Sequence, residues 1–444
     1  MTIDKIFNTD FVQYSSYDNC RSIASYVDGL KNSGRKVAYF CKDLKDFKKV
    51  SILKSEISLK SQYLHNEDIL SDIIVNFARD YDCSICGDLP LLEPLSAVGS
   101  RIRPSASSPR YSSVRKSKFY NLIFNTDDEK VLEQQHFEGV KIEPRFLLPT
   151  LPLILLYANN GMGVGFAQNI MPRSQNDIIS AIKDILKGKE PSAIYPTFKG
   201  YKGKIELLNS EFGKRQWKFT GVYNKLNNFN LEITETTPFA TNESMLVHLN
   251  KLKQDKIIKN YKDYSLGDNF KYTIQVSGEF WDKHSNIHKL LGIETTDTEN
   301  FTCIDENNFV KTFENEIEIL KAFIKIKLEY TQKRKDLLLN ELELSREFAS
   351  NKIKFITAIL DKKIVLDRKS KQEIVSQIQS IGITKNIETY ALMPLYSLSA
   401  DSINKLNKDL EAIENKKAEL LSKSPKDLWI ENILDLRKHY QPNY

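Results

Sequence analysis

The chain has 444 residues, 41% of them hydrophobic, which is enough for two to four domains with separate cores. Its 64 lysines and arginines face 58 acidic residues, and the net charge of +6 is too small to identify a nucleic-acid-binding protein by itself. Five cysteines without a framework spacing and the lack of a long apolar run argue against a secreted, disulfide-rich protein and against a membrane protein. We therefore expect a cytoplasmic protein.

Positive charge is concentrated in the N-terminal third of the chain. Residues 31–60 hold nine lysines and arginines against three acidic residues, and residues 94–126 hold six cations and no acid. The acid-free stretch surrounds Tyr111. Because positive charge stabilises a phenolate and also attracts a phosphate, this pattern favours attack of Tyr111 on a phosphodiester.

The first predicted domain, residues 1–148, contains short helices with basic flanks. Apolar residues have helical spacing at 69, 73, 74, 77 and 78, and Asn66 is placed to cap that helix. Residues 22–40 are also predicted to be helical at both ends, with a turn at 28–34. That turn places three cations at the start of the second helix, Lys31, Arg35 and Lys36. Cations at a helix N-terminus favour phosphate, and the pattern predicts a helix-turn-helix or winged-helix module.

The second predicted domain, residues 149–305, mixes helix and strand signals. An apolar segment up to Tyr157 is followed by a glycine-rich turn at 159–165, which lacks the lysine of a nucleotide-binding loop. A helix is expected at 178–186. Alternating apolar residues predict strands at 204–208, 216–223, 231–234 and 271–276. We therefore expect an α/β accessory domain.

The third region is predicted to be a long helical stalk, residues 306–350 and 399–424. No glycine or proline occurs between residues 293 and 381, and 314–350 is predicted to form one long helix. The returning helix begins near Ser399, which is suited to cap it, and carries a heptad-like seam. The seam consists of Ile403, Leu406, Leu410, Ile413, Lys417 and Leu420. Two antiparallel helices are implied.

Residues 351–398 are predicted to form a small helical knob at the end of the stalk. Its apolar residues are Ile353, Phe355, Ile356, Ile359 and Leu360. A knob far from the rest of the chain suits a contact such as dimerisation, and a simple helical bundle without a partner is the alternative. Residues 425–444 are expected to form a C-terminal helical segment.

The sequence does not favour a metal site. Cys83 and Cys86 form one Cys-x-x-Cys pair, but no second pair follows at zinc spacing, so two small buried residues are the favoured interpretation. His284 and His288 lack a third ligand and are interpreted as surface residues. We predict no metal site in this chain.

Short motifs follow one another in a fixed order along the chain. They are RSIASYVDGLK at 21–31 with GRKV at 34–37, YLHNE at 63–67, GSR at 99–101, SPRY at 108–111, NGMGVG at 160–165 and ITE at 233–235. Together they resemble the DNA breakage-reunion (A-type) subunit of type IIA topoisomerases, and the size is most similar to the medium subunit of T-even phage topoisomerases. The resemblance runs from residue 21 to the C-terminal helices.

The resemblance implies roles for individual residues. Tyr111 would form the 5′-phosphotyrosyl bond, and Arg110 would stabilise the transition state. His65 would lie near the scissile phosphate as a proton carrier or hydrogen-bond donor. Met162 falls where the family has an isoleucine that wedges between base pairs. The further candidate DNA contacts are Lys31, Arg35, Lys36, Lys49 and Arg101.

The resemblance also implies an architecture and partners. The expected fold is α+β and multidomain, with a winged-helix domain (1–148), a tower domain (149–305), a coiled-coil stalk and a C-gate dimerisation knob (351–398). No ATP-cradling loop is recognised in the chain, and no Asp-x-Asp cluster resembles the magnesium-binding module of the family. Mg²⁺ and ATP are therefore expected to be bound by a B-type partner subunit.

The expected substrate is double-stranded DNA, cut by a homodimer. Relaxation and decatenation are expected rather than negative supercoiling, because the β-rich wrapping domain of gyrase is not recognised in the sequence. If the protein is viral, its expected location is the cytoplasm of a bacterial host.

The sequence departs from the family pattern near the proposed site. Leu64 replaces the first histidine of the histidine motif, Asn66 replaces the following glycine, and residues 96–98 read SAV where the family has Gly-Gln-Phe. These departures leave open a cleavage-deficient protein that bends DNA and dimerises. A third possibility is a coiled-coil regulator with a winged helix, which would not need the central α/β domain.

Overall fold

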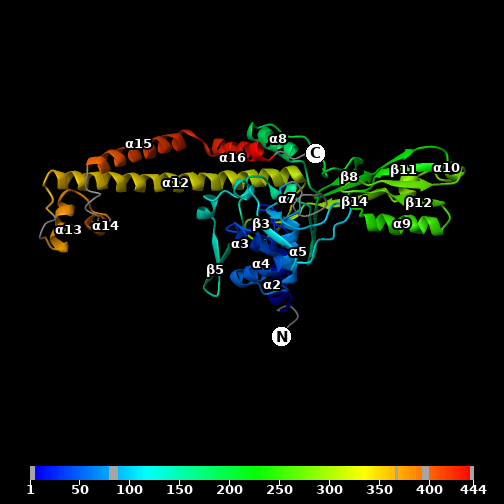
Figure 1. Ribbon diagram of the computed structural model, residues 1–444, viewed down its shortest axis with the longest axis horizontal. Helices are drawn as coiled ribbons and strands as arrows, with labels where there is room; N and C mark the ends of the chain where they lie inside the picture. The colour runs from blue at the N-terminus through cyan, green and yellow to red at the C-terminus, as the bar shows by residue number, and fades with distance from the viewer. Residues whose placement is uncertain (1–5, 80–88, 366–368, 386, 393–399, 441–444) are drawn as a thin grey trace. The chain divides into compact units, whose positions relative to one another are not determined.

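The structure is a computed structural model that describes residues 6–79, 89–365, 369–385, 387–392 and 400–440 (Figure 1). It divides into two compact units. The first comprises Met1–Lys327 and Glu431–Tyr444, and the second comprises Leu328–Ile430. None of the helices in the described residues combines the length and the apolar character needed to cross a membrane.

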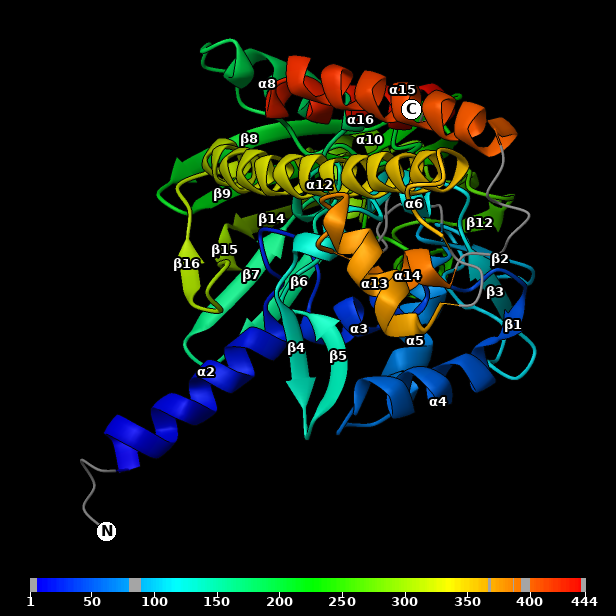
Figure 2. The same cartoon turned by 90° about the vertical axis from the view of Figure 1, so that its left-hand side faces the viewer.

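The N-terminal part of the first unit packs helices beside a small antiparallel sheet. The helical elements are η1 (Ile6–Asp10), α2 (Phe11–Ser22), α3 (Asn32–Phe40), α4 (Val50–Ser61) and α5 (Asp68–Phe77). The sheet has the strand order β1 (Lys48–Lys49), β3 (Ser113–Lys116), β2 (Leu92–Pro94). Helices α3, α4 and α5 contact one another and lie side by side in both views (Figures 1 and 2). Each contributes buried apolar side chains, such as Val37, Leu53 and Ile74.

The helix predicted from its apolar spacing is confirmed, whereas the one predicted to start at Ser22 is wrong. The side chain of Asn66 accepts a hydrogen bond from the amide of Asp68 (2.9 Å), the first residue of α5, but the N-cap position is occupied by Glu67, whose side chain makes no capping hydrogen bond. Helix α2 instead ends at Ser22, and residues 23–31 form a buried loop. Gly29 in this loop has φ +67°, and a Cβ there would lie 2.3 Å from the amide nitrogen of Ile154. The close approach of two backbones therefore excludes a helix here.

The next segment joins this part to the larger sheets. Its elements are α6 (Tyr120–Ile123), the 3₁₀ turn η2 (Asp128–Val131), the hairpin β4 (Gln134–Phe137) and β5 (Val140–Pro144), and α7 (Leu153–Leu156). The apolar segment that ends at Tyr157 is fully buried, with residues 153–157 at most 1% exposed. Gly29 packs directly against the backbone of this segment at Leu153 and Ile154.

A five-stranded antiparallel sheet follows. Its order is β6 (Asn159–Gly163), β7 (Phe166–Ile170), β14 (Glu294–Asn300), β9 (Lys214–Thr220) and β8 (Lys204–Glu211). Helix α8 (Gln175–Leu186) confirms the predicted helix and is capped by Ser174. The expected glycine-rich turn is mostly strand, because β6 pairs with β7 from Asn159 to Gly163 and only the tip at 164–165 turns.

A second, four-stranded sheet packs against helix α9 (Asn242–Gln254). Its order is β10 (Val222–Lys225), β11 (Asn230–Glu235), β13 (Tyr272–Gln275) and β12 (Asn260–Asp263). The short helices α10 (Phe280–Lys283) and α11 (Ile287–Leu290) and the hairpin β15 (Thr302–Ile304) and β16 (Val310–Thr312) complete this part. The predicted strands are confirmed, except that the one at 216–223 is divided between β9 and β10. A Cβ on Gly221 would lie 2.4 Å from the carbonyl oxygen of Glu235, so the chain crosses closely between the two sheets there.

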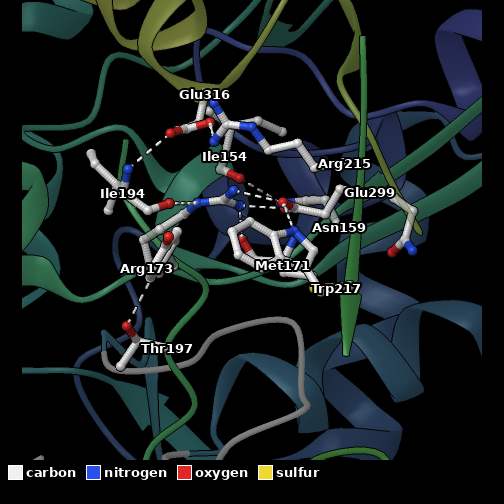
Figure 3. A network of polar contacts seen from close by, with 12 residues as sticks. Ile154, Asn159, Met171, Arg173, Ile194, Thr197, Arg215, Trp217, Glu299 and Glu316 are labelled. Atoms are coloured by element: carbon white, nitrogen blue, oxygen red, sulfur yellow. Dashed lines mark hydrogen bonds and ion pairs between the residues drawn. The ribbon is translucent and has the colours of Figure 1, made fainter. Parts of the chain in front are cut away.

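Buried ion pairs link the five-stranded sheet to the segments beside it (Figure 3). Arg173 pairs with Glu299 of β14 (2.5 Å), and both side chains are 0% exposed. Trp217 donates its indole N–H to the same carboxylate (2.8 Å). Arg215 pairs with Glu316, the first residue of α12 (Glu316–Leu360), and Glu316 also accepts from the amide of Ile194 (2.9 Å). Each charged side chain thus has an oppositely charged partner, as charges taken out of water require, although the buried Nε of Arg215 makes no hydrogen bond among the described residues.

The second unit confirms the long helix and its antiparallel return. Helix α12 is longer than predicted, and α15 (Ala400–Ser422) runs beside it (Figure 1). Lys335 donates to the carbonyl of Lys423 (2.6 Å), and Glu343 pairs with Lys417, which fixes the antiparallel direction. All six predicted seam residues of α15 are half-buried, including Lys417. Ser399 lies outside the described residues. Helix α16 (Pro425–His439) follows α15.

Helices α13 (Lys371–Ser380) and α14 (Ile387–Ala391) form a small core with the end of α12. Phe355 and Ile356 are buried as predicted, whereas Leu360 is 49% exposed. The buried side chains of this core are Phe355, Ala358, Ile364, Ile378, Ile383 and Tyr390. A core of its own makes the region a small folded knob.

Candidate nucleic-acid interface

The SPRY loop presents Tyr111 to solvent on a rigid support. The Tyr111 side chain is 71% exposed, and its amide donates to the carbonyl of Ser108 (2.8 Å). The amides at the start of α4 donate to the loop, from Val50 to Ser112 (2.9 Å) and from Ser51 to Pro109 (3.2 Å). The loop is thus tied to a helix N-terminus while its tyrosine stays free to meet a large substrate.

Two predicted cationic residues lie beside this loop. The guanidinium carbon of Arg110 is 5.3 Å from the centre of the Tyr111 ring, and Arg110 is exposed. Lys49 is exposed on β1, where it pairs with Ser113, two residues after Tyr111. No ion pair of Arg110 or Lys49 occurs among the described residues. The structure therefore brings a phenol and two available cations together at one surface.

A second group of predicted residues lines an open pocket of about 440 Å³. The pocket contains Lys31, His65 and Met162 together with Arg21 and Tyr63. Burial lowers the pKa of Lys31. Because a phosphate favours the charged form of a lysine, an anion entering the pocket would offset this cost. The pocket is therefore suited to a phosphate.

Met162 projects from the β6–β7 hairpin, which is pressed against α2. The Met162 side chain is 81% exposed. On either side of it, a Cβ at Gly161 would lie 2.1 Å from the carbonyl oxygen of Ser22, and one at Gly163 would lie 2.1 Å from Oδ1 of Asn19. The two glycines let the strand approach the helix, and the methionine points the other way, as expected of an apolar wedge.

His65 is held by residues of α2. The hydroxyl of Tyr17 lies 2.9 Å from Nε2 of His65, and a guanidinium nitrogen of Arg21 lies 3.1 Å from the same atom. The ring of Tyr63 packs edge-on against the imidazole, 5.6 Å away. His65 lines the pocket with Lys31 and Met162, and Tyr111 is not among the residues that line it.

A comparison with protein families shows the family of this chain. A family model that describes the A subunit of DNA gyrase/topoisomerase IV matches residues 21–435. The chain belongs to this family. It is 28% identical to DNA topoisomerase 2-alpha of Gallus gallus, over 98% of this chain and 30% of that protein. It is 31% identical to DNA topoisomerase 2 of Plasmodium falciparum, over 84% of this chain and 27% of that protein.

A solved structure has the same fold as this member of the topoisomerase family. It is the crystal structure of Plasmodium falciparum topoisomerase II DNA-binding, cleavage and re-ligation domain, with a TM-score of 0.86 and 28% identity. The match covers 97% of this chain and 63% of that chain. The chain spans less than a third of the length of the curated relatives named above. The predicted type IIA resemblance is confirmed, and the narrower likeness to a T-even phage medium subunit stays a prediction.

Two of the predicted DNA contacts of this chain are buried instead. Arg35 pairs with Asp28 (2.5 Å) beneath the 28–34 turn, and Lys36 pairs with Glu143 (2.7 Å). Arg35 and Lys36 are each 8% exposed. Asp28 also accepts from the amides of Leu30 and Leu147, so the pair organises the loop. The prediction that these cations reach the DNA backbone is wrong for this structure, because each is already neutralised by a buried carboxylate.

Arg101 is also not available for DNA. Its guanidinium makes two hydrogen bonds to the carboxylate of Glu235 (2.8 and 3.2 Å), and both side chains are at most 4% exposed. The neighbouring Ile102 belongs to the core of the four-stranded sheet. The GSR motif therefore anchors the Tyr111 region to that sheet, and the prediction of a DNA contact by Arg101 is wrong.

Sequence reasoning missed Tyr17 and Arg21 as site residues. They are four residues apart on α2, so they share one face of the helix. Arg21 opens the RSIASYVDGLK motif, which was a usable signal, whereas nothing in the sequence connects Tyr17 to His65. Among the described residues, no group of three or more histidine, cysteine or acidic side chains could hold a metal ion. Cys83 and Cys86 lie outside the described residues.

Proposed function

We propose that this chain cuts and rejoins DNA as part of a type II topoisomerase, through a transient 5′-phosphotyrosyl bond at Tyr111. The observation that carries the proposal is the SPRY loop. Tyr111 is 71% exposed, Arg110 contacts its ring, and the loop is fixed to the start of α4. Family membership supports the same chemistry.

The proposed reaction conserves the energy of the cut strand. The Tyr111 hydroxyl gives up its proton as its oxygen attacks the phosphorus, the bond from phosphorus to the 3′ oxygen breaks, and the 3′ oxygen takes up a proton. In the reverse step, the 3′ hydroxyl attacks the phosphotyrosine and releases the phenol. Arg110 would hold the extra negative charge on the phosphoryl oxygens with paired hydrogen bonds. Lys49, exposed on β1, would contact the DNA backbone nearby.

The pocket with His65 is assigned to a neighbouring part of the duplex. Lys31 would bind a backbone phosphate there, and His65 would donate a hydrogen bond or carry a proton. Met162, 81% exposed on strand β6 near the tip of its hairpin, would wedge between base pairs and bend the duplex.

The finer architecture follows the same proposal. We assign α3 to α5 with the β1–β3–β2 sheet to the winged-helix domain, and the two larger sheets to the tower. Helices α12 and α15 form the coiled-coil stalk. The knob would be the dimerisation gate, with two Tyr111 residues cutting opposite strands. Its support is a hydrophobic core of its own.

Mg²⁺ and ATP are assigned to a B-type partner subunit. When bound there, Mg²⁺ would polarise the scissile phosphate. The described residues offer no cluster that fits a metal ion, so the steps above use only the side chains of this chain. The proposed location is the cytoplasm.

A second candidate is a protein that bends DNA and dimerises without cutting. Leu64, which replaces a histidine of the family, is 70% exposed beside His65 and offers no polar atom to a phosphate. This observation is the one that favours the alternative.

An activity assay separates the two candidates. The full chain is mixed with a B-type partner, supercoiled plasmid, Mg²⁺ and ATP, and the products are examined before and after a detergent trap. Relaxation and covalent protein on DNA ends, both lost in Tyr111→Phe, would support cleavage. Tyr264→Phe, an exposed tyrosine of the tower, is the matched control. The partner is first shown to support DNA cleavage by another A-type chain. If this chain then bends DNA but forms no covalent adduct with that partner, the alternative would be favoured.

A further inference from the structure

The hydroxyl of Tyr17 contacts His65, a site residue that is distant in the sequence. Its oxygen lies 2.9 Å from Nε2 of His65, 48 residues further on, and the two rings are 6.4 Å apart. The Tyr17 side chain is 54% exposed, so burial does not force this contact. The two rings are tilted by 40° and the guanidinium of Arg21 lies over the Tyr17 ring, so the hydroxyl is the group of Tyr17 that reaches His65.

Arg21 contacts the same imidazole. One of its nitrogens lies 3.1 Å from Nε2 and 3.3 Å from Nδ1 of His65. A guanidinium only donates hydrogen bonds, so it requires a ring nitrogen that carries no proton. The tyrosine hydroxyl can donate or accept, and it therefore suits either tautomer of a singly protonated ring. Tyr17 can thus stay bound whichever nitrogen carries the proton.

We propose that Tyr17 is a positioning residue that holds His65 in place when a DNA phosphate draws Arg21 away. The inference rests on the proposed function, in which His65 faces the DNA. Arg21 lines the same pocket as Lys31, and a guanidinium bonds more strongly to a phosphate than to a neutral imidazole. Once Arg21 has moved, the hydrogen bond with Tyr17 and the edge contact of Tyr63 still hold the ring, among the residues that the structure describes.

A spectroscopic test examines the contact without DNA or a partner. The full chain is labelled with ¹⁵N in its histidine rings, and His65→Gln assigns the signals of His65. Tyr17→Phe removes the hydroxyl and is expected to shift the His65 nitrogen signals. Tyr14→Phe, an exposed tyrosine on the same helix, is expected to leave them unchanged. Unchanged His65 signals in Tyr17→Phe would overturn the inference.

A double-mutant cycle examines the effect on cleavage. In the complex with its partner, Tyr17→Phe is expected to slow formation of the covalent adduct about fivefold, the size of one hydrogen bond, with DNA affinity unchanged. In a His65→Ala background the same change is expected to have no further effect. An equal fivefold loss in both backgrounds would show that Tyr17 acts independently of His65 and would overturn the inference. Absence of an adduct from the wild-type chain would instead overturn the proposed function.

Discussion

Two basic motifs of this chain differ in the exposure of their cations. In the 28–36 segment, Arg35 and Lys36 of helix α3 are each 8% exposed and are paired with Asp28 and Glu143, respectively. In the SPRY loop, Arg110 is exposed beside Tyr111. Both motifs contain cations, yet one uses its charge to hold a loop together and the other offers it to a substrate. Positive charge in a motif therefore identifies an interface only after its acidic partners are known.

The largest expected effect is on the stability of the buried turn. Arg35→Met leaves Asp28 buried without its partner and is expected to lower the free energy of unfolding by about 3 to 5 kcal/mol. Arg110→Met removes an exposed charge and is expected to change it by less than about 0.5 kcal/mol. Thermal unfolding of the full chain measures both. Equal effects of the two substitutions would erase the proposed distinction.

In catalysis, the larger effect is expected from the exposed Arg110. Arg110→Met is expected to slow covalent cleavage by about 100-fold, the usual effect of removing one donor to a charged transition state, while the fold is kept. Adduct formation over time, with circular dichroism as a check on folding, provides the measurement. A rate within about twofold of the wild type would mean that Arg110 is only a surface cation.

A smaller effect is expected at the wedge. Met162→Ala removes an 81% exposed side chain, so stability is expected to stay within about 0.5 kcal/mol of the wild type. Bending of a DNA duplex, measured by fluorescence transfer between its ends, is expected to decrease because the apolar wedge is lost. Phe166→Ala, on the paired strand of the hairpin, serves as a comparison. Unaltered bending in Met162→Ala would reject the wedge.

The smallest effect is expected at the ion pair beside the SPRY loop. Partial burial alone would raise the pKa of Glu93, but hydrogen bonds from the Lys118 amide and from Arg115 outweigh it and lower the pKa. A lowered carboxyl pKa stabilises the fold above the unfolded value of about 4.3, and this stabilisation is lost as the pH falls through the folded value. Glu93→Gln is thus expected to cost under about 1 kcal/mol at pH 7 and nothing near pH 2. An equal cost at both pH values would contradict this account.

The sequence was informative where the signal is local. The absence of glycine and proline over 293–381 predicted α12, and the heptad-like spacing predicted the half-buried face of α15. The SPRY motif predicted Tyr111 and Arg110, which the structure places together.

The sequence was not informative where partners are distant. Glu143 lies 107 residues from Lys36, and Glu235 lies 134 residues from Arg101. The stretch around Tyr111 is acid-free in sequence, but in space Glu235 and Glu93 neutralise two of its arginines, Arg101 and Arg115. No window of sequence contains that information, because it depends on how the strands pair.

Identifying the residue that carries the DNA tests directly whether Tyr111 is the nucleophile. The trapped complex is digested with nuclease and trypsin, and mass spectrometry locates the remaining nucleotide. A phosphate-linked nucleotide is expected on Tyr111 in the peptide 111–115, attached through the 5′ end of the DNA. A nucleotide on any other tyrosine, or a linkage through the 3′ end, would contradict this expectation.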